Sequence, residues 1–316
     1  MITELISFAV DEESTASSFI KLAYSLWNTV LKSCYNTLKV NPIKWGSGNN
    51  SLLAQMIAGR VESVIIAIAT GLLILVFVVG VLREGGHIIS EKGQPYGVIS
   101  LMFRFFICAG LIRAYLFIAS TIFDVFTSAI NGLGIGKETK GYGLLNPETT
   151  SILPHAESKN FLQSFWDAIS GKQMLYMAVI EVLGLIYMLI IVVCAFIVFF
   201  KVYGRYFRVI IAVIIAPIGF ALYASPMTEQ QAKKFLFYLV KLGAEGLIMT
   251  LILILYDKFI SYGKAIIPDF ISELTGASGN DNLLRAYVAF MVSQIFFCIL
   301  LVSLISASEK LAEELL

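Results

Sequence analysis

Residues 201–226 read KVYGRYFRVIIAVIIAPIGFALYASP, and they place three cations and a proline in one of the most apolar regions of the chain. Lys201, Arg205 and Arg208 lie at i, i+4 and i+7, so in a helix they share one stripe. Pro217 lies inside the apolar run that follows, where it removes one backbone hydrogen bond and permits a kink. A chain that carries a basic stripe and a helix breaker inside an apolar run has to be understood in terms of a membrane.

The composition places the whole chain in the membrane class. Of its 316 residues, 58% are hydrophobic and only 14% are charged, and the mean hydropathy is +0.83. Soluble domains carry about 25% charged residues. Several apolar runs exceed the roughly 20 residues that a helix needs to cross a bilayer. We therefore predict an all-α polytopic protein with about five to six transmembrane helices. Its net charge of +1 gives no global attraction to nucleic acid.

Hydrophobic periodicity divides the chain into four segments. Residues 1–60 form an amphipathic N-terminal region, 61–130 a first transmembrane hairpin, 131–172 a polar loop with a short interfacial helix, and 173–316 a C-terminal transmembrane bundle. The helix expected over residues 14–40 has a polar stripe opposite an apolar face. It either lies on the membrane surface with its lysines at the headgroups or lines a water-filled passage in an oligomer. The expected spans are residues 61–82, 98–126, 174–200, 206–223, 235–256 and 283–305.

The quoted stretch predicts a hairpin between two of these spans. One helix from Met174 to Tyr223 would have fifty residues and extend roughly 75 Å, far more than a bilayer. Gly204 and the three cations are therefore predicted to form the connection, and cations in a short connection favour the cytoplasmic side. This orientation puts the amino terminus and the polar loop outside. Residues 266–274, with Pro268 near their start, suggest a separate surface or re-entrant piece.

Charges inside the predicted spans are the candidate polar contacts of the fold. A charged side chain near the bilayer centre costs about 2.5–3.5 kcal/mol on insertion scales and persists where it finds a partner or water. These residues either pair and hold the bundle in register, or line a conduit or dock partner helices. Arg104 and Arg113 point to nearly opposite sides of their helix, which requires packing on both sides or a break near Gly110. The candidates are Arg104, Arg113, Glu181, Lys241 and Glu245. Lys241 and Glu245 form an i,i+4 pair that can neutralise itself.

Catalytic and cofactor motifs are missing from the sequence. Only His87 and His155 occur, and neither has a second metal ligand at a recognised spacing. The stretch GLGIGKET at 132–139 departs from a phosphate loop because Asn131 and Glu138 replace the required glycine and hydroxyl residue. The cysteines are isolated, without a C-x-x-C pair. We expect no catalytic residue, no metal and no cofactor, and hence no enzyme.

The layout resembles the TrbL-type polytopic subunits of type IV secretion and conjugation machines. The resemblance is carried by the basic junction FFKVYGRYFRV, the proline-containing helix IIAVIIAPIGFALYASP and the lysine-bearing segment TEQQAKKFLFYLVKLGAEGLI. It covers most of the chain by layout and is specific over about residues 200–250. The family often has a tryptophan where this chain has FLFYLVKLG.

The resemblance implies a non-enzymatic channel or scaffold subunit in the cytoplasmic (inner) membrane. Such subunits oligomerise around the translocation path, contact other membrane subunits and a cytoplasmic ATPase, and help pass a relaxase–DNA complex or effector proteins outward. Lys201, Arg205 and Arg208 would then dock the ATPase or the transferred polyanion. The alternative is a small-solute transporter or an ion channel subunit, which would need a clustered charged site at one depth. A purely structural anchor for a larger complex is a third possibility.

Overall fold

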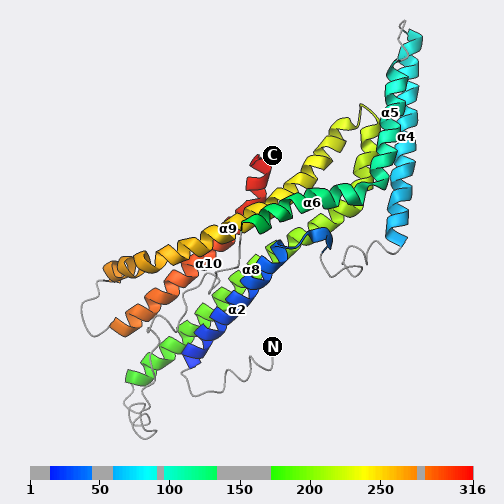
Figure 1. Cartoon of the computed structure of the whole chain (residues 1–316). Helices are drawn as coiled ribbons and strands as arrows, with labels where there is room; N and C mark the ends of the chain where they lie inside the picture. Colours follow the sequence, from blue (N-terminus) through cyan, green and yellow to red (C-terminus); the bar gives the residue numbers. More distant parts are fainter. Residues whose placement is uncertain (1–14, 45–59, 91–95, 134–171, 276–281, 316) are drawn as a thin grey trace. The chain divides into compact units, whose positions relative to one another are not determined.

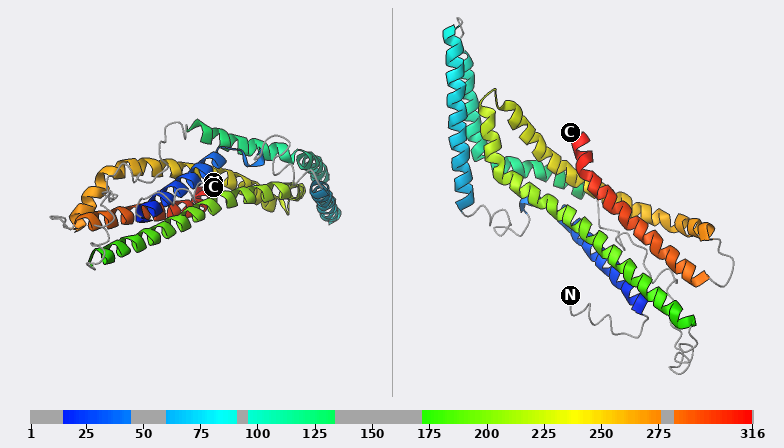
Figure 2. Two further views of the ribbon diagram at one scale, coloured as in Figure 1. Left: turned by 90° about the horizontal axis from the view of Figure 1, so that it is seen from below. Right: turned by 180° about the vertical axis from the view of Figure 1, so that it is seen from behind.

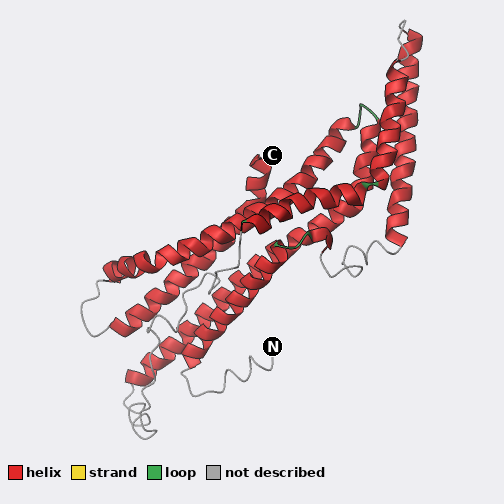
Figure 3. Cartoon of the chain, in the orientation of Figure 1, coloured by secondary structure: helices red, strands yellow, loops and turns green. Residues whose placement is uncertain are grey.

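The structure, a computed structural model, describes residues 15–44, 60–90, 96–133, 172–275 and 282–315 (Figure 1). This part of the chain contains seven α-helices and two short 3-10 helices. Within it no strand occurs, and Figure 3 shows helices joined by loops. The predicted all-α class is therefore confirmed. The short helix expected within the polar loop falls on residues outside the described ranges.

Five helical segments among the described residues are long and apolar enough to cross a membrane. They are Arg60–Glu84, Tyr115–Gly132, Val182–Ala224, Glu229–Ile260 and Phe290–Leu315. The chain is thus a multi-pass membrane protein, in agreement with the predicted number of spans. Because lipid offers no hydrogen bonds, only segments that satisfy their backbone internally can cross it.

The chain divides into two compact units. The first comprises Met1–Asn36, Ile135–Lys201 and Leu251–Ala307. The second comprises Thr37–Gly134, Val202–Thr250 and Ser308–Leu316. Several long helices contribute residues to both units, so each unit is described from its own portions of them.

In the first unit, α2 (Thr15–Leu38) lies beside α8 (Lys172–Ala221), and α9 (Glu229–Thr275) beside α10 (Asn282–Leu315) (Figures 1 and 2). The apolar face of α2 is buried, with Trp27 and Cys34 fully inaccessible. The periodicity correctly predicted this helix and its two faces. However, protein rather than lipid covers the apolar face, so α2 is not a helix whose apolar side rests in the bilayer.

The second unit begins with a helical hairpin made of α4 (Arg60–Ser90) and α5 (Tyr96–Arg113). The two helices pack along their length, with the Phe77 and Phe105 rings 4.8 Å apart between centroids. Close packing depends on Gly80, where a Cβ would lie 3.3 Å from Leu101 Cδ2. The unit continues with α6 (Tyr115–Gly132) and with the portions of α8 and α9 that flank the 3-10 helix η3 (Leu222–Ala224).

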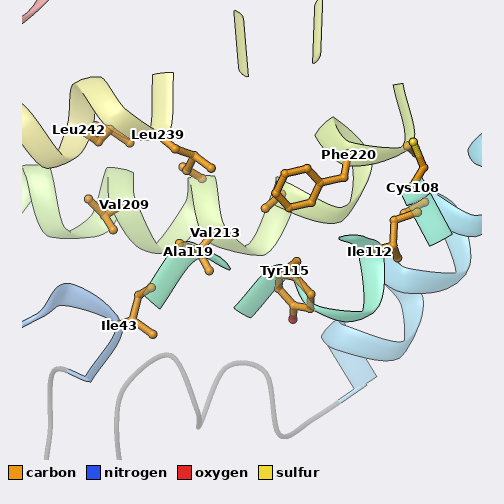
Figure 4. Packing of buried hydrophobic residues seen from close by; sticks show 14 of the residues in the cluster. Ile43, Cys108, Ile112, Tyr115, Ala119, Val209, Val213, Phe220, Leu239 and Leu242 are labelled. Atoms are coloured by element: carbon orange, nitrogen blue, oxygen red, sulfur yellow. The ribbon is translucent and has the colours of Figure 1, made fainter. Parts of the chain in front are cut away.

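One apolar cluster holds this unit together (Figure 4). It joins Cys108 and Ile112 of α5 and Tyr115 of α6 to Val213 and Phe220 of α8. Leu239 and Leu242 of α9, and Ile43 of the 3-10 helix η1 (Pro42–Lys44), complete it. Lipid is as apolar as these side chains, so their packing contributes through close contact rather than through removal from water.

Three predicted boundaries are wrong or displaced. The hairpin expected at Gly204 does not exist, because α8 runs without interruption from Lys172 to Ala221 and carries Pro217 inside it. The piece expected to stand apart over residues 266–274 instead belongs to α9, which continues to Thr275. The second predicted span is divided at Ala114 (φ −93°, ψ 8°). The opposed positions of Arg104 and Arg113 required either packing on both sides of the helix or a break near Gly110. The break is found four residues beyond Gly110.

Candidate functional site

The most deeply buried cation of the second unit is Arg205 on α8. Its side chain lies in the interior, and its Nε donates a hydrogen bond to the Leu242 carbonyl of α9 at 2.9 Å. The guanidinium rests against Gly246, where any Cβ would overlap it. It also lies 5.7 Å from the centroid of the Tyr206 ring. A glycine on α9 therefore makes the space that an arginine on α8 occupies.

Arg208, one turn further along α8, divides its guanidinium between two carboxylates. Nη2 donates to Glu245 Oε1 of α9 at 2.7 Å, and Nη1 lies 2.8 Å from Glu309 Oε1 of α10. The Glu245 side chain is 1% exposed, whereas that of Glu309 is 47% exposed. Arg205, Arg208, Glu245 and Glu309, here called the three-helix network, combine two positive and two negative charges. A balanced set of this kind lowers the cost of burying each member.

One atom of the three-helix network stays unsatisfied. Glu245 Oε2 is buried and accepts no hydrogen bond from the residues that the structure describes. A buried carboxylate oxygen without a donor is costly, so this is the position in the network where a proton or a water would be most favourable.

The predicted pair of Lys241 and Glu245 is wrong. Lys241 Nζ instead contacts Glu313 Oε2 of α10 at 3.1 Å, and Glu245 turns to Arg208. The i,i+4 spacing permits a contact on one helix, but α8 and α10 each offer a charge across a helix interface. The last turns of α10 are thus held by two ion pairs, through Glu309 and Glu313.

The structure therefore does not present Lys201, Arg205 and Arg208 as one free basic stripe. Arg205 is inside the protein and Arg208 is engaged by two carboxylates. Lys201 is half-buried, and no ion pair links it to another residue in the described ranges. The helical spacing of these cations was predicted correctly, but the sequence could not tell that Arg205 and Arg208 contact α9 and α10.

A second polar cluster lies where α8 leads into α9. Arg104 Nη1 of α5 lies 2.6 Å from Glu229 Oε2, and the same carboxylate binds Lys233 Nζ through Oε1 at 2.6 Å. The Arg104 guanidinium also lies 5.8 Å from the centroid of the Tyr223 ring. This intramembrane candidate is thus paired, with a carboxylate that the sequence analysis did not single out.

A third cluster anchors the end of α2 to α6. Asn41 Nδ2 donates to Asp124 Oδ1 at 2.7 Å, and Lys44 Nζ lies 2.9 Å from Asp124 Oδ2. Nearby, the Tyr206 hydroxyl donates to the Val40 carbonyl at 2.8 Å and also to the Thr37 carbonyl. Asp124 is therefore not the partner of Arg113.

The remaining two candidates differ from the others. Arg113 is exposed at the end of α5, and no ion pair joins it to any residue of the described ranges. Glu181 belongs to α8, but its side chain lies outside the described set. Among the described residues no group of three or more His, Cys, Asp or Glu could hold a metal ion.

Sequence reasoning missed three acidic partners, Glu229, Glu309 and Glu313. Each lies in a segment that reads as an ordinary polar helix end, and the only available signal was the i,i+4 spacing of Glu309 and Glu313. Lys241 lies 72 residues from Glu313 in the sequence, and Arg104 lies 125 residues from Glu229.

The fold and these contacts define an all-α, multi-pass membrane protein whose helices are joined by ion pairs, one of which involves the buried Glu245. Comparison of the chain with protein-family models, curated proteins and solved structures finds no match. Its function is therefore inferred from the ion pairs and hydrogen bonds between its helices and from the resemblance of its sequence to TrbL-type subunits.

Proposed function

We propose that the chain is a non-enzymatic channel or scaffold subunit of a type IV secretion machine in the cytoplasmic membrane. It would oligomerise around the translocation path, bind other membrane subunits and a cytoplasmic ATPase, and assist transfer of a relaxase–DNA complex or of effector proteins. The proposal rests on the resemblance to TrbL-type subunits, and the arrangement of charges in the second unit supports it.

The observation that carries the proposal is that the two stretches specific to the resemblance pack against each other. FFKVYGRYFRV supplies Arg205 and Arg208, and TEQQAKKFLFYLVKLGAEGLI supplies the Leu242 carbonyl, Glu245 and Gly246. The sequence features shared with the family are thus contacts that hold two helices together. Packing between α8 and α9 is enough to explain why these two stretches occur in one chain, and it requires no catalytic reaction.

The same contacts favour a scaffold over a solute transporter. A solute site needs charged or polar groups that are left open at one depth. In the second unit, Arg104, Asp124, Arg208 and Lys241 are all occupied by partners within the chain. Glu245 Oε2 is the observation that supports the alternative, an ion channel or transporter subunit, because it is an unsatisfied intramembrane carboxylate oxygen.

Fewer cations of the basic stripe are available to dock a partner than the sequence indicates. Arg205 and Arg208 would have to leave their partners before they could bind an ATPase or a polyanion. Only Lys201 remains a candidate for that role, and we propose the other two as structural contacts of the helix bundle.

A transfer assay tests the proposal. In the host of this chain, an in-frame deletion should abolish transfer of a selectable plasmid or a tagged effector, and expression of the chain from a second locus should restore it. A Lys201→Ala variant that assembles normally should transfer at a reduced frequency if this cation docks a partner.

Flux measurements distinguish the alternative. Liposomes containing the purified chain should show no more leakage of protons, potassium or small dyes than empty liposomes. Normal transfer by the deletion strain would contradict the proposed function, and a selective flux that Glu245→Gln removes would favour the ion channel.

A further inference from the structure

Residues 308–315, the last turns of α10, belong to the second unit and contact two of its cations. Glu309 Oε1 lies 2.8 Å from Arg208 Nη1 of α8, and Glu313 Oε2 lies 3.1 Å from Lys241 Nζ of α9. Because the two carboxylates are four residues apart, they share one face of the helix, one turn from each other. We call Arg208 and Lys241 together the basic dock.

We propose that the basic dock is a binding site for an acidic helix of a partner protein, and that residues 308–315 are its built-in, exchangeable occupant. The partner helix would carry two carboxylates four residues apart and would displace these turns from α8 and α9. The proposal rests on contacts within the second unit alone. It goes beyond the proposed secretion function, because it concerns how access to one site of the chain is controlled.

Little apolar packing holds these turns in place. Among residues 308–315 only Ser308 and Ala312 are buried, and both have small side chains. The two leucines of the segment face outward, with Leu311 41% and Leu315 73% exposed. The turns are therefore held mainly by their two ion pairs. Because helix ends with few buried apolar contacts open at low free energy, this segment can leave while the rest of α10 stays in place.

Departure of the turns leaves no deeply buried charge without a partner. Arg208 keeps Glu245 Oε1 at 2.7 Å through Nη2, so it remains a structural contact of the bundle in both states. Glu309 and Glu313 are 47% and 69% exposed, and water solvates such carboxylates once their cations are gone. Lys241 is only 19% exposed. A carboxylate from outside therefore gains more from Lys241 than from a fully solvated lysine.

The way these turns sit favours a protein helix over a nucleic acid as the exchanging partner. Ser308 and Ala312 directly precede the two glutamates, and both are 0% exposed. Small side chains let helix backbones approach closely, which brings the carboxylates within reach of the dock. The bound pattern is thus a small residue followed by Glu, repeated after four positions on a helix. A chain of phosphates would supply the charges but not the small side chains that fill this contact.

Hydrogen exchange tests whether the turns are released. The full chain is purified in mild detergent, and backbone exchange of residues 308–315 is compared between the wild type and the Glu309→Gln/Glu313→Gln variant, here called the vacated chain. Exchange should be faster in the vacated chain. In the wild type it should rise when salt is raised from about 0.1 M to about 1 M, which shortens the Debye length from about 10 Å to about 3 Å. The vacated chain should respond little to salt.

Binding of a helical peptide tests the dock itself. The acidic probe has the sequence of residues 305–315 with a hydrocarbon staple between the exposed positions 310 and 314, because so short a helix is not stable alone. The control probe carries Glu309→Gln and Glu313→Gln. The acidic probe should bind the vacated chain at least about tenfold more tightly than the wild type, in which the built-in turns occupy the dock. The control probe should bind neither chain.

A charge exchange identifies the contact. Lys241→Glu in the vacated chain should abolish binding of the acidic probe, and a probe with Glu313→Lys should restore it. If these variants do not accumulate, the wild type carries the test, because excess acidic probe should speed exchange of residues 308–315 by displacing them.

Four results would overturn the proposal. They are equal binding of the two probes, equal affinity of the two chains, exchange of residues 308–315 in the wild type that ignores salt, and a short DNA duplex that binds the vacated chain as tightly as the acidic probe. The readouts are binding and exchange rather than transfer, so this inference and the proposed function can fail independently.

Discussion

At the scale of single residues, Gly246 determines whether Arg205 can remain buried. We expect Gly246→Ala to displace the guanidinium from the α9 backbone, because the new Cβ would overlap it. The Nε hydrogen bond to Leu242 would be lost with it. The variant should have a clearly lower melting temperature in mild detergent. Gly204→Ala is the matched control, because a Cβ there meets no atom within 4 Å and alanine favours helices by about 1 kcal/mol over glycine. Equal melting temperatures of the two variants would contradict the packing.

The three-helix network predicts an order among its variants. Arg208→Gln leaves the buried Glu245 without its cation and should be the most damaging, since an uncompensated buried charge costs about 3–5 kcal/mol. Glu245→Gln leaves Arg208 with Glu309 and should cost less. Glu309→Gln should cost least, because Glu309 is half exposed.

The double variant provides the decisive comparison. Arg208→Gln combined with Glu245→Gln should be more stable than Arg208→Gln alone, because both members of the buried pair become neutral. Thermal unfolding of the purified variants measures this order, and the membrane level of each variant controls for expression. If the losses in the double variant simply add, the two residues are not coupled.

At the scale of elements, α8 is the helix that sequence reasoning divided. A helix of 50 residues permits two solutions, a hairpin at the cations or a single helix longer than the bilayer is thick. The sequence around Gly204 contains nothing that chooses between them. The choice depends on Glu245, Glu309 and Leu242, which lie on α9 and α10. These residues bind Arg205 and Arg208, so α8 can continue without a turn at the cations.

A proline substitution separates the two solutions. Gly204→Pro should cost about 3 kcal/mol or more in a continuous helix, because it removes one hydrogen bond and clashes with the preceding turn. We expect strongly reduced accumulation in the membrane, whereas Gly204→Ala at the same position should accumulate normally. In a surface hairpin, proline would be tolerated as well as alanine. Quantitative immunoblotting of membrane fractions makes the comparison, and normal levels of both variants would reinstate the hairpin.

At the scale of the whole molecule, apolar runs and helical periodicity were enough to predict the class. The buried residues of α2, among them Ile20, Trp27 and Leu31, lie on the face that the spacing indicated. The contacts of the candidate site could not be predicted from the sequence in the same way. Arg208 meets Glu309 across about a hundred residues, and single-sequence spacing reports only on neighbours within a helix. Elements could thus be predicted because their signals are local, whereas the partners of the charges could not.

The burial of all four cysteines allows both units to be followed in one experiment. Cys34 and Cys298 belong to the first unit and Cys108 to the second, and all are free and buried. Burial raises the pKa of the Cys34 thiol to about 12. Cys108 is buried inside the apolar cluster of the second unit. Because the thiolate is the reactive form, the folded protein should resist maleimides at pH 7 and still do so at pH 8.5.

Unfolding in dodecyl sulfate should reverse this protection. An unperturbed thiol has a pKa of about 8.5, so all four cysteines should then react, and faster at pH 8.5 than at pH 7. Mass spectrometry of the labelled peptides gives the reaction of each cysteine separately. Increasing denaturant by steps should show whether Cys34 and Cys108 become reactive together, which is expected because α2, α8, α9 and α10 contribute residues to both units. Rapid labelling of either cysteine in the folded protein at pH 7 would mean that its unit is more open than the buried thiols indicate.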